Sequence, residues 1–401
     1  FPHREGGQGV RSERSGAMPE FCVPALVLTG AGCAQEVGAI LHGRGYRRAF
    51  VVTDPGVMGG DEAQRVMGSL SAAGLAPVIH DGITSEPTVR LIDAALEAFR
   101  AAAGDVVIGL GGGSPMDSAK SVAVLARNPG PLPVYEGVDR IPDQRAPLVC
   151  IATTAGTGSE VTRYVAATDE ARNRKMLLTS WRLLPDVAVA DPDLTLAVPP
   201  RVTVSTGVDA LTHAIEAFVS RRAQPLSDTL ALSAIRRIGG ALRRVYRDPH
   251  DRDGRAAMSL AALEAGIAFC NASVALVHGM ARPLGAYFPV PHGLANAVLL
   301  ARVSAFTAPA APERYRAVAV ALGQPASDAS PEAGASAAVE AISRLCADLD
   351  VPSLAALGVP AEQFESVVAQ MAADALASGS PANNPRAPTA EEIVALYRAC
   401  Y

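Results

Sequence analysis

Four residues in the second half of the chain have the types and spacing of metal ligands. Asp209 and His213 lie four residues apart in TGVDALTHAIEAFVS, which has the pattern of an amphipathic helix, so their side chains share one face. His278 and His292 follow in VHGMARPLGAYFPVPHG, each before a glycine that allows the backbone to turn sharply. The chain has only seven histidines, and three of them belong to this set, which is therefore a candidate metal site.

The chemistry of this set fits a divalent ion. One carboxylate oxygen and three imidazole nitrogens suit Fe(II), Zn(II), Co(II) or Mn(II). The set contains no cysteine, which argues against a structural zinc site. Taken singly, a histidine is more often a hydrogen-bonded core or surface residue than a ligand, so spacing alone leaves both interpretations open.

A glycine-rich segment in the first half is a candidate phosphate site. Residues 106–120 read VVIGLGGGSPMDSAK, which predicts a buried strand, a turn of three glycines and a helix that starts near Ser114. Such a turn lets backbone N–H groups approach a pyrophosphate at the helix N-terminus. The segment departs from GxGxxG, because Ser114 replaces the third glycine, and it follows the third predicted strand instead of the first. A tight turn without a ligand is the alternative.

Two further turns could complete a dinucleotide site. Residues 153–160 read TTAGTGSE after a predicted strand, and they could line a cofactor or simply cap a helix near Ser159 and Glu160. Asp54 ends the predicted strand RAFVVTD. Its carboxylate could accept hydrogen bonds from ribose hydroxyls and repel a 2′-phosphate, which favours NAD over NADP. An aspartate before a proline is also an ordinary turn residue.

The elements that must position these residues divide the chain in two. From about residue 25 to 193, short β-branched runs alternate with amphipathic stretches, which predicts an α/β domain with a parallel sheet. The expected strands are 48–53, 76–80, 105–109, 148–153 and 187–190, and the first expected helices are 61–73 and 88–103.

The remainder of the chain predicts an all-helical domain. After residue 200 the sequence is rich in Ala, Leu, Glu and Arg at helical spacing. Residues 259–277 carry one charge, Glu264, and are interrupted by Asn271, so we expect a buried helix and not a membrane span. The expected division is a disordered leader at 1–17, a dinucleotide-binding domain at 18–200 and a metal-binding domain at 201–401.

Composition excludes several classes of function. A chain of 401 residues exceeds what one core normally fills, so two domains are expected. With 49% apolar residues, 19% charged residues and a net charge of -5, no broad basic surface for nucleic acid is expected. The six cysteines are scattered without a CxxC pair, which favours a reducing cytoplasm over a disulfide-stapled fold.

Five ordered blocks resemble the signature segments of iron-containing alcohol dehydrogenases: GGGSPMDSAK, TTAGTGSEVT, LLPDVAVADPDLT, TGVDALTHAIEAFVS and HGMARPLGAYFPVPHGLANA. The resemblance runs from about residue 24 to the C-terminus. It implies an α/β domain for NAD(P), a helical domain for the metal and catalysis in the cleft between them. Asp209, His213, His278 and His292 match the four metal ligands of the family. The positions that match its dinucleotide contacts are Asp54, Gly113, Ser114, Thr153, Thr154, Thr162, Tyr164, Lys175 and Leu194.

The chain departs from the family pattern at two positions. Arg282 stands where many relatives have a second histidine that is taken to relay protons, and arginine stays protonated near neutral pH. The guanidinium could instead bind an anionic group of the substrate, as in a phosphonoacetaldehyde-like aldehyde, or contact the cofactor pyrophosphate or a nearby carboxylate. Glu86 stands where many relatives place an asparagine near the cofactor.

The resemblance implies a reductase of a small aldehyde that uses NAD(H) and a divalent metal, with Fe(II) expected and Zn(II) as the alternative. The metal would polarise the aldehyde oxygen while NADH delivers hydride. Two other activities remain open, a lyase of the dehydroquinate synthase kind and a hydroxyacid–oxoacid transhydrogenase with tightly held cofactor. Relatives are commonly dimers or larger, so a homo-oligomer is expected, with no nucleic acid or membrane partner.

Overall fold

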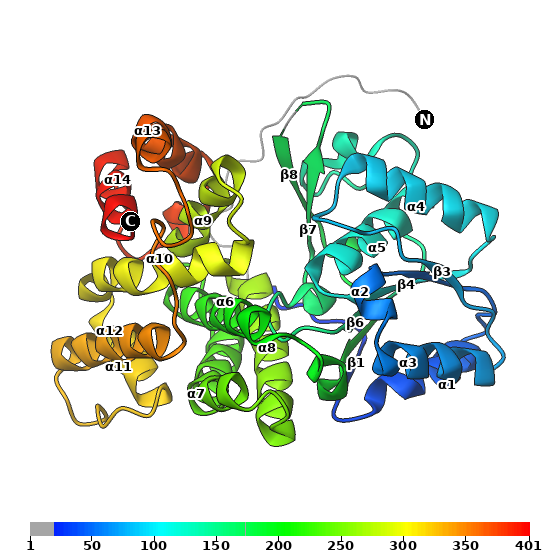
Figure 1. The fold of residues 1–401 in the computed structure, drawn as a ribbon, viewed down its shortest axis with the longest axis horizontal. Helices are drawn as coiled ribbons and strands as arrows, with labels where there is room; N and C mark the ends of the chain where they lie inside the picture. Colours follow the sequence, from blue (N-terminus) through cyan, green and yellow to red (C-terminus); the bar gives the residue numbers. More distant parts are fainter. Residues whose placement is uncertain (1–19, 173) are drawn as a thin grey trace, which may run out of the picture.

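The computed structural model describes residues 20–172 and 174–401. The predicted leader at 1–17 lies outside the described residues. Figure 1 shows two halves, an α/β half built around a twisted sheet and a half made of helices, which meet along one side of that sheet.

A six-stranded parallel sheet forms the centre of the first half. Its strands are β1 Leu26–Thr29, β2 Ala49–Val52, β3 Val78–His80, β4 Val106–Gly111, β6 Leu148–Ala152 and β9 Val187–Ala190, in the order β1-β9-β6-β4-β2-β3. The four central strands are buried throughout, as expected for apolar runs covered on both faces. All five predicted strands are present. The edge strand β1 was not predicted, because LVLT is too short to stand out by pattern.

Helices cover both faces of this sheet. The helices α1 Val37–Gly43 and α3 Asp61–Ala72 pack on one face, while α4 Val89–Ala101 and α5 Gly113–Leu125 pack on the other. Successive strand residues point to opposite faces of the sheet. Val51 packs in the core beneath α1 and α3, and Val52 packs in the core beneath α4 and α5. The helices predicted at 61–73 and 88–103 are confirmed to within two residues at each end.

A second, three-stranded sheet was not predicted. It consists of β5 Gly137–Val138, β8 Arg174–Thr179 and β7 Tyr164–Asp169, with β7 and β8 antiparallel. In Figure 1 this hairpin rises beside the junction of the two halves. Its strands alternate between buried and exposed positions and carry several charged residues, so their apolar signal is weak.

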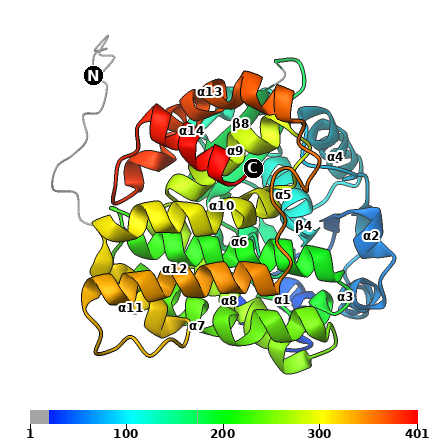
Figure 2. The same ribbon diagram turned by 60° about the vertical axis from the view of Figure 1, so that its left-hand side comes forward.

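The second half is helical, and no strand occurs in the described residues after 190. Its helices are α6 Pro200–Val219, α7 Pro225–Arg247, α8 Arg252–Ala272, α9 Leu276–Tyr287, α10 His292–Thr307, α11 Pro312–Ala321, α12 Pro331–Asp348, α13 Ala361–Ala377 and α14 Ala390–Ala399. Figure 2 brings this half forward, and α10 packs against both α6 and α12. Shorter helices are α2 Pro55–Met58, η1 Cys33–Glu36, η2 Leu132–Tyr135, η3 Ser159–Val161, η4 Trp181–Leu183, η5 Pro192–Thr195, η6 Ala308–Ala310 and η7 Ser380–Asn383.

The prediction of one buried helix over residues 259–277 is wrong. The helix α8 ends at Ala272, Ser273 adopts a φ of 68°, and α9 starts at Leu276 with its axis turned by 101°. The apolar pattern continues across the break because both helices are buried. The apolar pattern therefore does not predict the change of direction. A carboxylate on another helix, that of Glu216 on α6, stabilises the start of α9.

One segment of the described residues, His292–Ala310, is by itself long and apolar enough to cross a membrane. Of its most apolar window, 56% is buried inside the helical half. A core helix passes the same test of length and composition, so this segment is weak evidence for a membrane span.

Candidate metal and dinucleotide site

Three of the four predicted metal ligands converge from three helices. Asp209 lies on α6, His278 at the start of α9 and His292 at the first position of α10. Their ligand atoms lie within 4.8 Å of one another, with 3.6 Å between Asp209 Oδ1 and His278 Nε2 and 4.0 Å between Asp209 Oδ1 and His292 Nε2. These separations suit one ion bound between the three atoms at about 2.0–2.2 Å from each.

His213 lies next to this group, with its ring between two others. It stacks on Phe269 at 4.1 Å between ring centroids and on His278 at 4.5 Å. The ring is buried, and within the described residues its Nδ1 has no hydrogen-bond partner. A buried nitrogen without a partner beside three converging donors is consistent with a missing ligand. Asp209, His278 and His292 therefore fit a bound divalent ion, while the ring of His213 lies beside them, outside the group whose ligand atoms are within 4.8 Å of one another.

Glu216, which the sequence analysis did not single out, orients His278. This buried carboxylate accepts hydrogen bonds from His278 Nδ1 at 2.6 Å, from its backbone N–H and from the backbone N–H groups of Ala275 and Val277. It thus caps α9 and leaves Nε2 of the histidine as the nitrogen that faces the other ligands. Its position seven residues after Asp209, on the same face of the same helix, was the feature of the sequence that could have indicated its role.

The pKa shifts of Asp209, His213 and His292 suit cation binding. Burial would raise the pKa of Asp209, but the surrounding histidines lower it well below its usual range. Burial lowers the pKa of His213 to about 3, and burial together with neighbouring positive charges lowers that of His292 to about 4, although 43% of the His292 side chain is exposed. Burial acts to lower the pKa of His278, but its hydrogen bonds to Asp209 and Glu216 raise it. Because a charged carboxylate and neutral imidazoles are the forms that bind a metal, Asp209, His213 and His292 are in the binding form, and an ion would displace a proton from His278.

The two predicted phosphate turns lie side by side at the carboxyl edge of the sheet. The strands β4 and β6 are neighbours, with Gly111 paired to Ala152. The chain leaves β2 toward β3 and leaves β4 toward β6, so the connections diverge between β2 and β4, where α/β sheets bind their ligands. A Cβ on Gly113 would come within 3.3 Å of Thr157. The helix α5 starts at Gly113, and Ser114 lies in its first turn, so its free N–H groups face this edge.

A fully buried lysine joins the two turns, and the sequence analysis missed it. Lys120 Nζ donates to Ser159 Oγ at 3.0 Å, to Thr162 Oγ1 at 3.2 Å and to the carbonyl of Tyr164 at 3.0 Å. Asp117 lies one helical turn earlier and accepts a hydrogen bond from Ser159 Oγ at 2.6 Å. This network holds α5 against the segment that carries two of the predicted cofactor residues.

The same segment contacts the helical half. A Cβ on Gly156 would overlap Thr206 of α6, and one on Gly158 would overlap Gly266 of α8, so only glycine permits these close approaches. Tyr164 stacks on Phe269 at 6.0 Å, and Phe269 stacks on His213. The cofactor turn and the metal helices therefore pack directly together.

Four predicted cofactor residues differ in how far contacts within the protein account for them. Thr153 is buried at the end of β6, and Thr154 Oγ1 has no hydrogen-bond partner in the described part of the chain. One oxygen of Asp54 caps α2 through the N–H of Val57, as the alternative interpretation expected. Leu194 is buried in the core on the α1 and α3 side of the sheet.

Lys175 on β8 pairs with Glu86, with 2.7 Å between Nζ and Oε2. Both side chains are largely exposed, so the pair contributes little stability. Glu86 is one of the two departures from the family pattern, and its partner is a predicted cofactor residue.

Arg282, the other departure, lies one turn after His278 on α9. Its Nη1 donates to Ser380 Oγ at 2.9 Å. Within residues 20–172 and 174–401 it forms no ion pair, although the negative charge of Glu216 acts on it. Burial lowers its pKa, and its positive charge in turn lowers the pKa of His292.

Family models match both halves of the chain. The model for iron-containing alcohol dehydrogenase matches residues 24–192, and the C-terminal model of the same family matches residues 203–401. The chain belongs to the iron-containing alcohol dehydrogenase family. Its fold, with a parallel α/β half and a helical half, is the fold of that family, and its enzyme class is that of an iron-type alcohol oxidoreductase.

Relatives extend along nearly the whole chain. Lactaldehyde reductase of Escherichia coli (strain K12) is 39% identical over 375 residues, which cover 93% of this chain and 97% of that protein. 1,3-Propanediol dehydrogenase of Citrobacter freundii is 36% identical over 387 residues, covering 96% and 99%. A crystal structure of 1,3-propanediol oxidoreductase superposes with a TM-score of 0.93 at 36% identity, covering 96% of this chain and 100% of that one.

A further solved structure is that of sulfoacetaldehyde reductase from Bifidobacterium kashiwanohense in complex with NAD+. It has a TM-score of 0.86 and 28% identity, and it covers 96% of this chain and 99% of that one.

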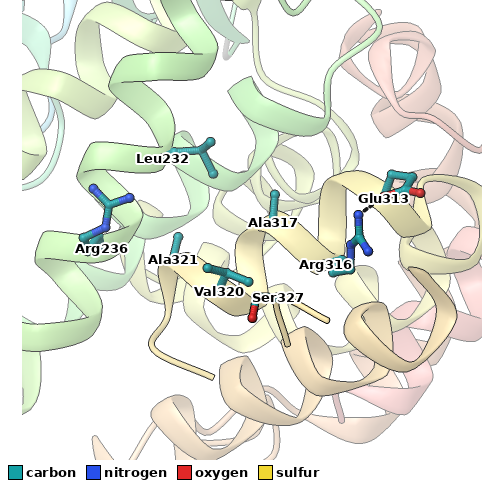
Figure 3. Close-up of a pocket in the computed structure, with 8 residues that line it drawn as sticks. All are labelled: Leu232, Arg236, Glu313, Arg316, Ala317, Val320, Ala321 and Ser327. Atoms are coloured by element: carbon teal, nitrogen blue, oxygen red, sulfur yellow. Dashed lines mark hydrogen bonds and ion pairs between the residues drawn. The ribbon is translucent and has the colours of Figure 1, made fainter. Parts of the chain in front are cut away.

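A surface pocket of about 280 Å³ lies elsewhere, between α7 and α11. Figure 3 shows Leu232 and Arg236 on one side of it and Ala317 and Val320 on the other. None of the predicted site residues lines this pocket, and it does not bear on the chemistry.

Proposed function

We propose that this alcohol dehydrogenase reduces a small aldehyde that carries an anionic group, using NADH and Fe(II). The observation that carries the proposal is that Arg282, one helical turn from the predicted metal ligand His278, forms no ion pair among the described residues. The positive charges of Arg282 and Lys175 both lower the pKa of His292, although Lys175 is also paired with Glu86. Such an arrangement would attract a carboxylate, sulfonate or phosphonate.

Each group has a defined task in this proposal. A bound Fe(II) would supply a Lewis acid for the aldehyde oxygen and NADH would supply the hydride. Asp209, His213, His278 and His292 would hold the ion. The β4–α5 turn, with Gly113 and Ser114, would bind the pyrophosphate, and Asp54 would accept hydrogen bonds from the adenosine ribose through the oxygen that does not cap α2.

Arg282 would orient the substrate through its anionic end. Its Nη1 is held by Ser380, which leaves other guanidinium N–H groups for a bidentate pair of hydrogen bonds. Because arginine cannot exchange a proton near neutral pH, the alkoxide would take its proton from water or from a cofactor hydroxyl. The sulfoacetaldehyde reductase among the structural neighbours supports the proposal, since its name is that of an enzyme for an anionic aldehyde.

The test is NADH oxidation by metal-stripped and Fe(II)-reconstituted protein on pairs of neutral and anionic aldehydes of similar size. We expect metal-dependent turnover with a preference for the anionic members. Arg282→Leu should raise KM for anionic aldehydes roughly 10- to 100-fold, the range for a lost charged hydrogen-bond pair, and leave neutral aldehydes nearly unchanged. Arg237→Leu, at an arginine that pairs with Glu264 away from the site, is the matched control.

Equal losses on both aldehyde classes would contradict the role given to Arg282. Turnover of aldehydes without net consumption of NADH would favour the transhydrogenase. No redox reaction with any aldehyde would favour the lyase.

A further inference from the structure

One ion pair joins a loop at the carboxyl edge of the large sheet to the hairpin of β7 and β8. Glu86 lies in the loop between β3 and α4, and Lys175 lies on β8. Lys175 Nζ and Glu86 Oε2 are 2.7 Å apart, and the two side chains are 42% and 55% exposed. An exposed pair of this kind is weakly held, so a ligand with a stronger negative charge can displace the carboxylate.

The hairpin that carries Lys175 runs beside α5, the helix that starts at the predicted phosphate turn. The backbone N–H of Ala166 on β7 donates to the carboxylate of Asp117 on α5 at 2.9 Å. The positive charge of Lys175 also reaches His292 on α10, whose pKa it lowers. Lys175 therefore lies on a strand that is anchored to the phosphate-turn helix, within electrostatic reach of the metal group.

The loop that carries Glu86 is fixed to the same hairpin. The N–H of Thr168 on β7 donates to the carbonyl of Pro87 at 2.8 Å, and Thr168 stands opposite Lys175 in the register of the hairpin. These backbone contacts hold the two charged residues next to each other. Exchange of the carboxylate for another partner of Lys175 therefore needs only a rotation of side chains.

We propose that Glu86 competes with the phosphates of the dinucleotide for the ammonium of Lys175, and thereby sets how tightly the cofactor binds and how fast it leaves. The inference rests on the proposed dinucleotide site and adds a residue that acts against binding. A pyrophosphate carries two negative charges, so it attracts an ammonium more strongly than one carboxylate does. The carboxylate still weakens binding, because Lys175 must lose one partner to gain the other.

The charge of Glu86 is what makes the competition possible. An asparagine, which many relatives have at this position, carries no charge and forms no ion pair with a lysine. A glutamate also repels the cofactor phosphates directly, and this repulsion acts in the same direction as the competition. Cofactor release from this chain is therefore expected to be faster than release from a variant that is neutral at residue 86.

The test measures NADH binding to the Fe(II)-loaded protein, with Kd from equilibrium fluorescence titration and release rates from stopped-flow mixing. Glu86→Gln keeps the shape of the side chain and removes its charge. Lys175→Met removes the ammonium, alone and in combination with Glu86→Gln. Glu170→Gln is the matched control, because Glu170 pairs with Arg90 between the start of α4 and the same hairpin, and its replacement changes the net charge by the same amount.

We expect Glu86→Gln to lower the Kd for NADH roughly 3- to 10-fold, mainly through slower release. Glu170→Gln should leave this Kd within about twofold of the wild type. Lys175→Met should raise Kd by a larger factor in the Glu86→Gln protein than in the wild type, because in the wild type the same change also removes the competing pair. The effect of Glu86→Gln should shrink as the ionic strength rises, since both partners are exposed.

An unchanged or higher Kd in Glu86→Gln would overturn the proposal, because the carboxylate would then not oppose binding. A larger loss from Lys175→Met in the wild type than in Glu86→Gln would overturn it as well. That result would show that the pair persists beside the bound cofactor, with Lys175 shielding the phosphates from Glu86. In either case a wild type that binds NADH keeps the proposed function, whereas a wild type that binds no nicotinamide dinucleotide would overturn both.

Discussion

Replacing Glu216 with glutamine tests whether this carboxylate orients a metal ligand in addition to capping α9. The carboxylate accepts four N–H donors, three from the backbone at the start of α9 and one from the ring of His278. A glutamine of the same shape offers one oxygen and turns an NH₂ group toward at least one of those donors. His278 then loses the charged partner that fixes its tautomer and orientation.

The magnitudes follow from these contacts. At least one buried N–H is left without an acceptor, which costs about 1–3 kcal/mol of unfolding free energy. Loss of the group that orients a ligand lowers metal affinity on the order of 10- to 100-fold. Glu216→Gln should therefore lower both the Tm of the metal-free protein and its affinity for Fe(II) and Zn(II).

The assay combines chelator competition with thermal unfolding in the presence and absence of metal. Glu264→Gln is the control, because Glu264 is also a buried carboxylate, with Ser233 and Arg237 as partners, but lies away from the ligands. It should lower Tm without changing metal affinity. If Glu216→Gln lowers Tm and its metal affinity stays within about twofold of the wild type, the carboxylate acts as a helix cap alone.

Two further changes probe the α/β half. Asp54→Ser keeps a capping oxygen for α2 and removes the negative charge. The ratio of kcat/KM with NADPH to kcat/KM with NADH should therefore rise on the order of tenfold, or ~1.4 kcal/mol. An unchanged ratio in steady-state assays would show that other residues determine the cofactor preference. Burial raises the pKa of Glu160 from 4.5 to about 7. The free energy of unfolding that depends on this group is therefore fully present below pH 4.5 and is lost as the pH rises through about 7. The loss is roughly 3 kcal/mol. Glu160→Gln removes that loss and should raise Tm relative to the wild type more at pH 8 than at pH 5; equal differences at both pH values would show that this carboxyl does not titrate there.

Sequence patterns determined the two halves and most of the central sheet. Four of the central strands are apolar on both faces, and a run of this kind has few alternatives to a buried strand in a parallel sheet. The hairpin of β7 and β8 was not predicted, because its strands are half exposed and their apolar pattern is weak. The break between α8 and α9 was not predicted, because a buried helix and a buried bend have the same apolar composition.

The candidate ligands and phosphate turns were available from residue type and spacing, and the family resemblance assigned their roles. Asp209 and His213 share a helix face by their separation alone. That His278 and His292 reach the same point depends on the bend at Ser273 and on the packing of α9 and α10 against α6, which no local pattern encodes.

Only the tertiary structure disclosed the groups that act on the ligands. Glu216 and Lys120 each follow a predicted site residue at helical spacing, which places them on the right face of a helix without indicating a partner. The partners of Lys120 lie 39 to 44 residues away in the chain, and those of Glu216 lie 59 to 62 residues away. The sequence determines which side chains can do the chemistry, because type and local spacing are properties of one segment. Which donors meet which acceptors is decided by packing, because burial brings together segments whose patterns are independent of one another.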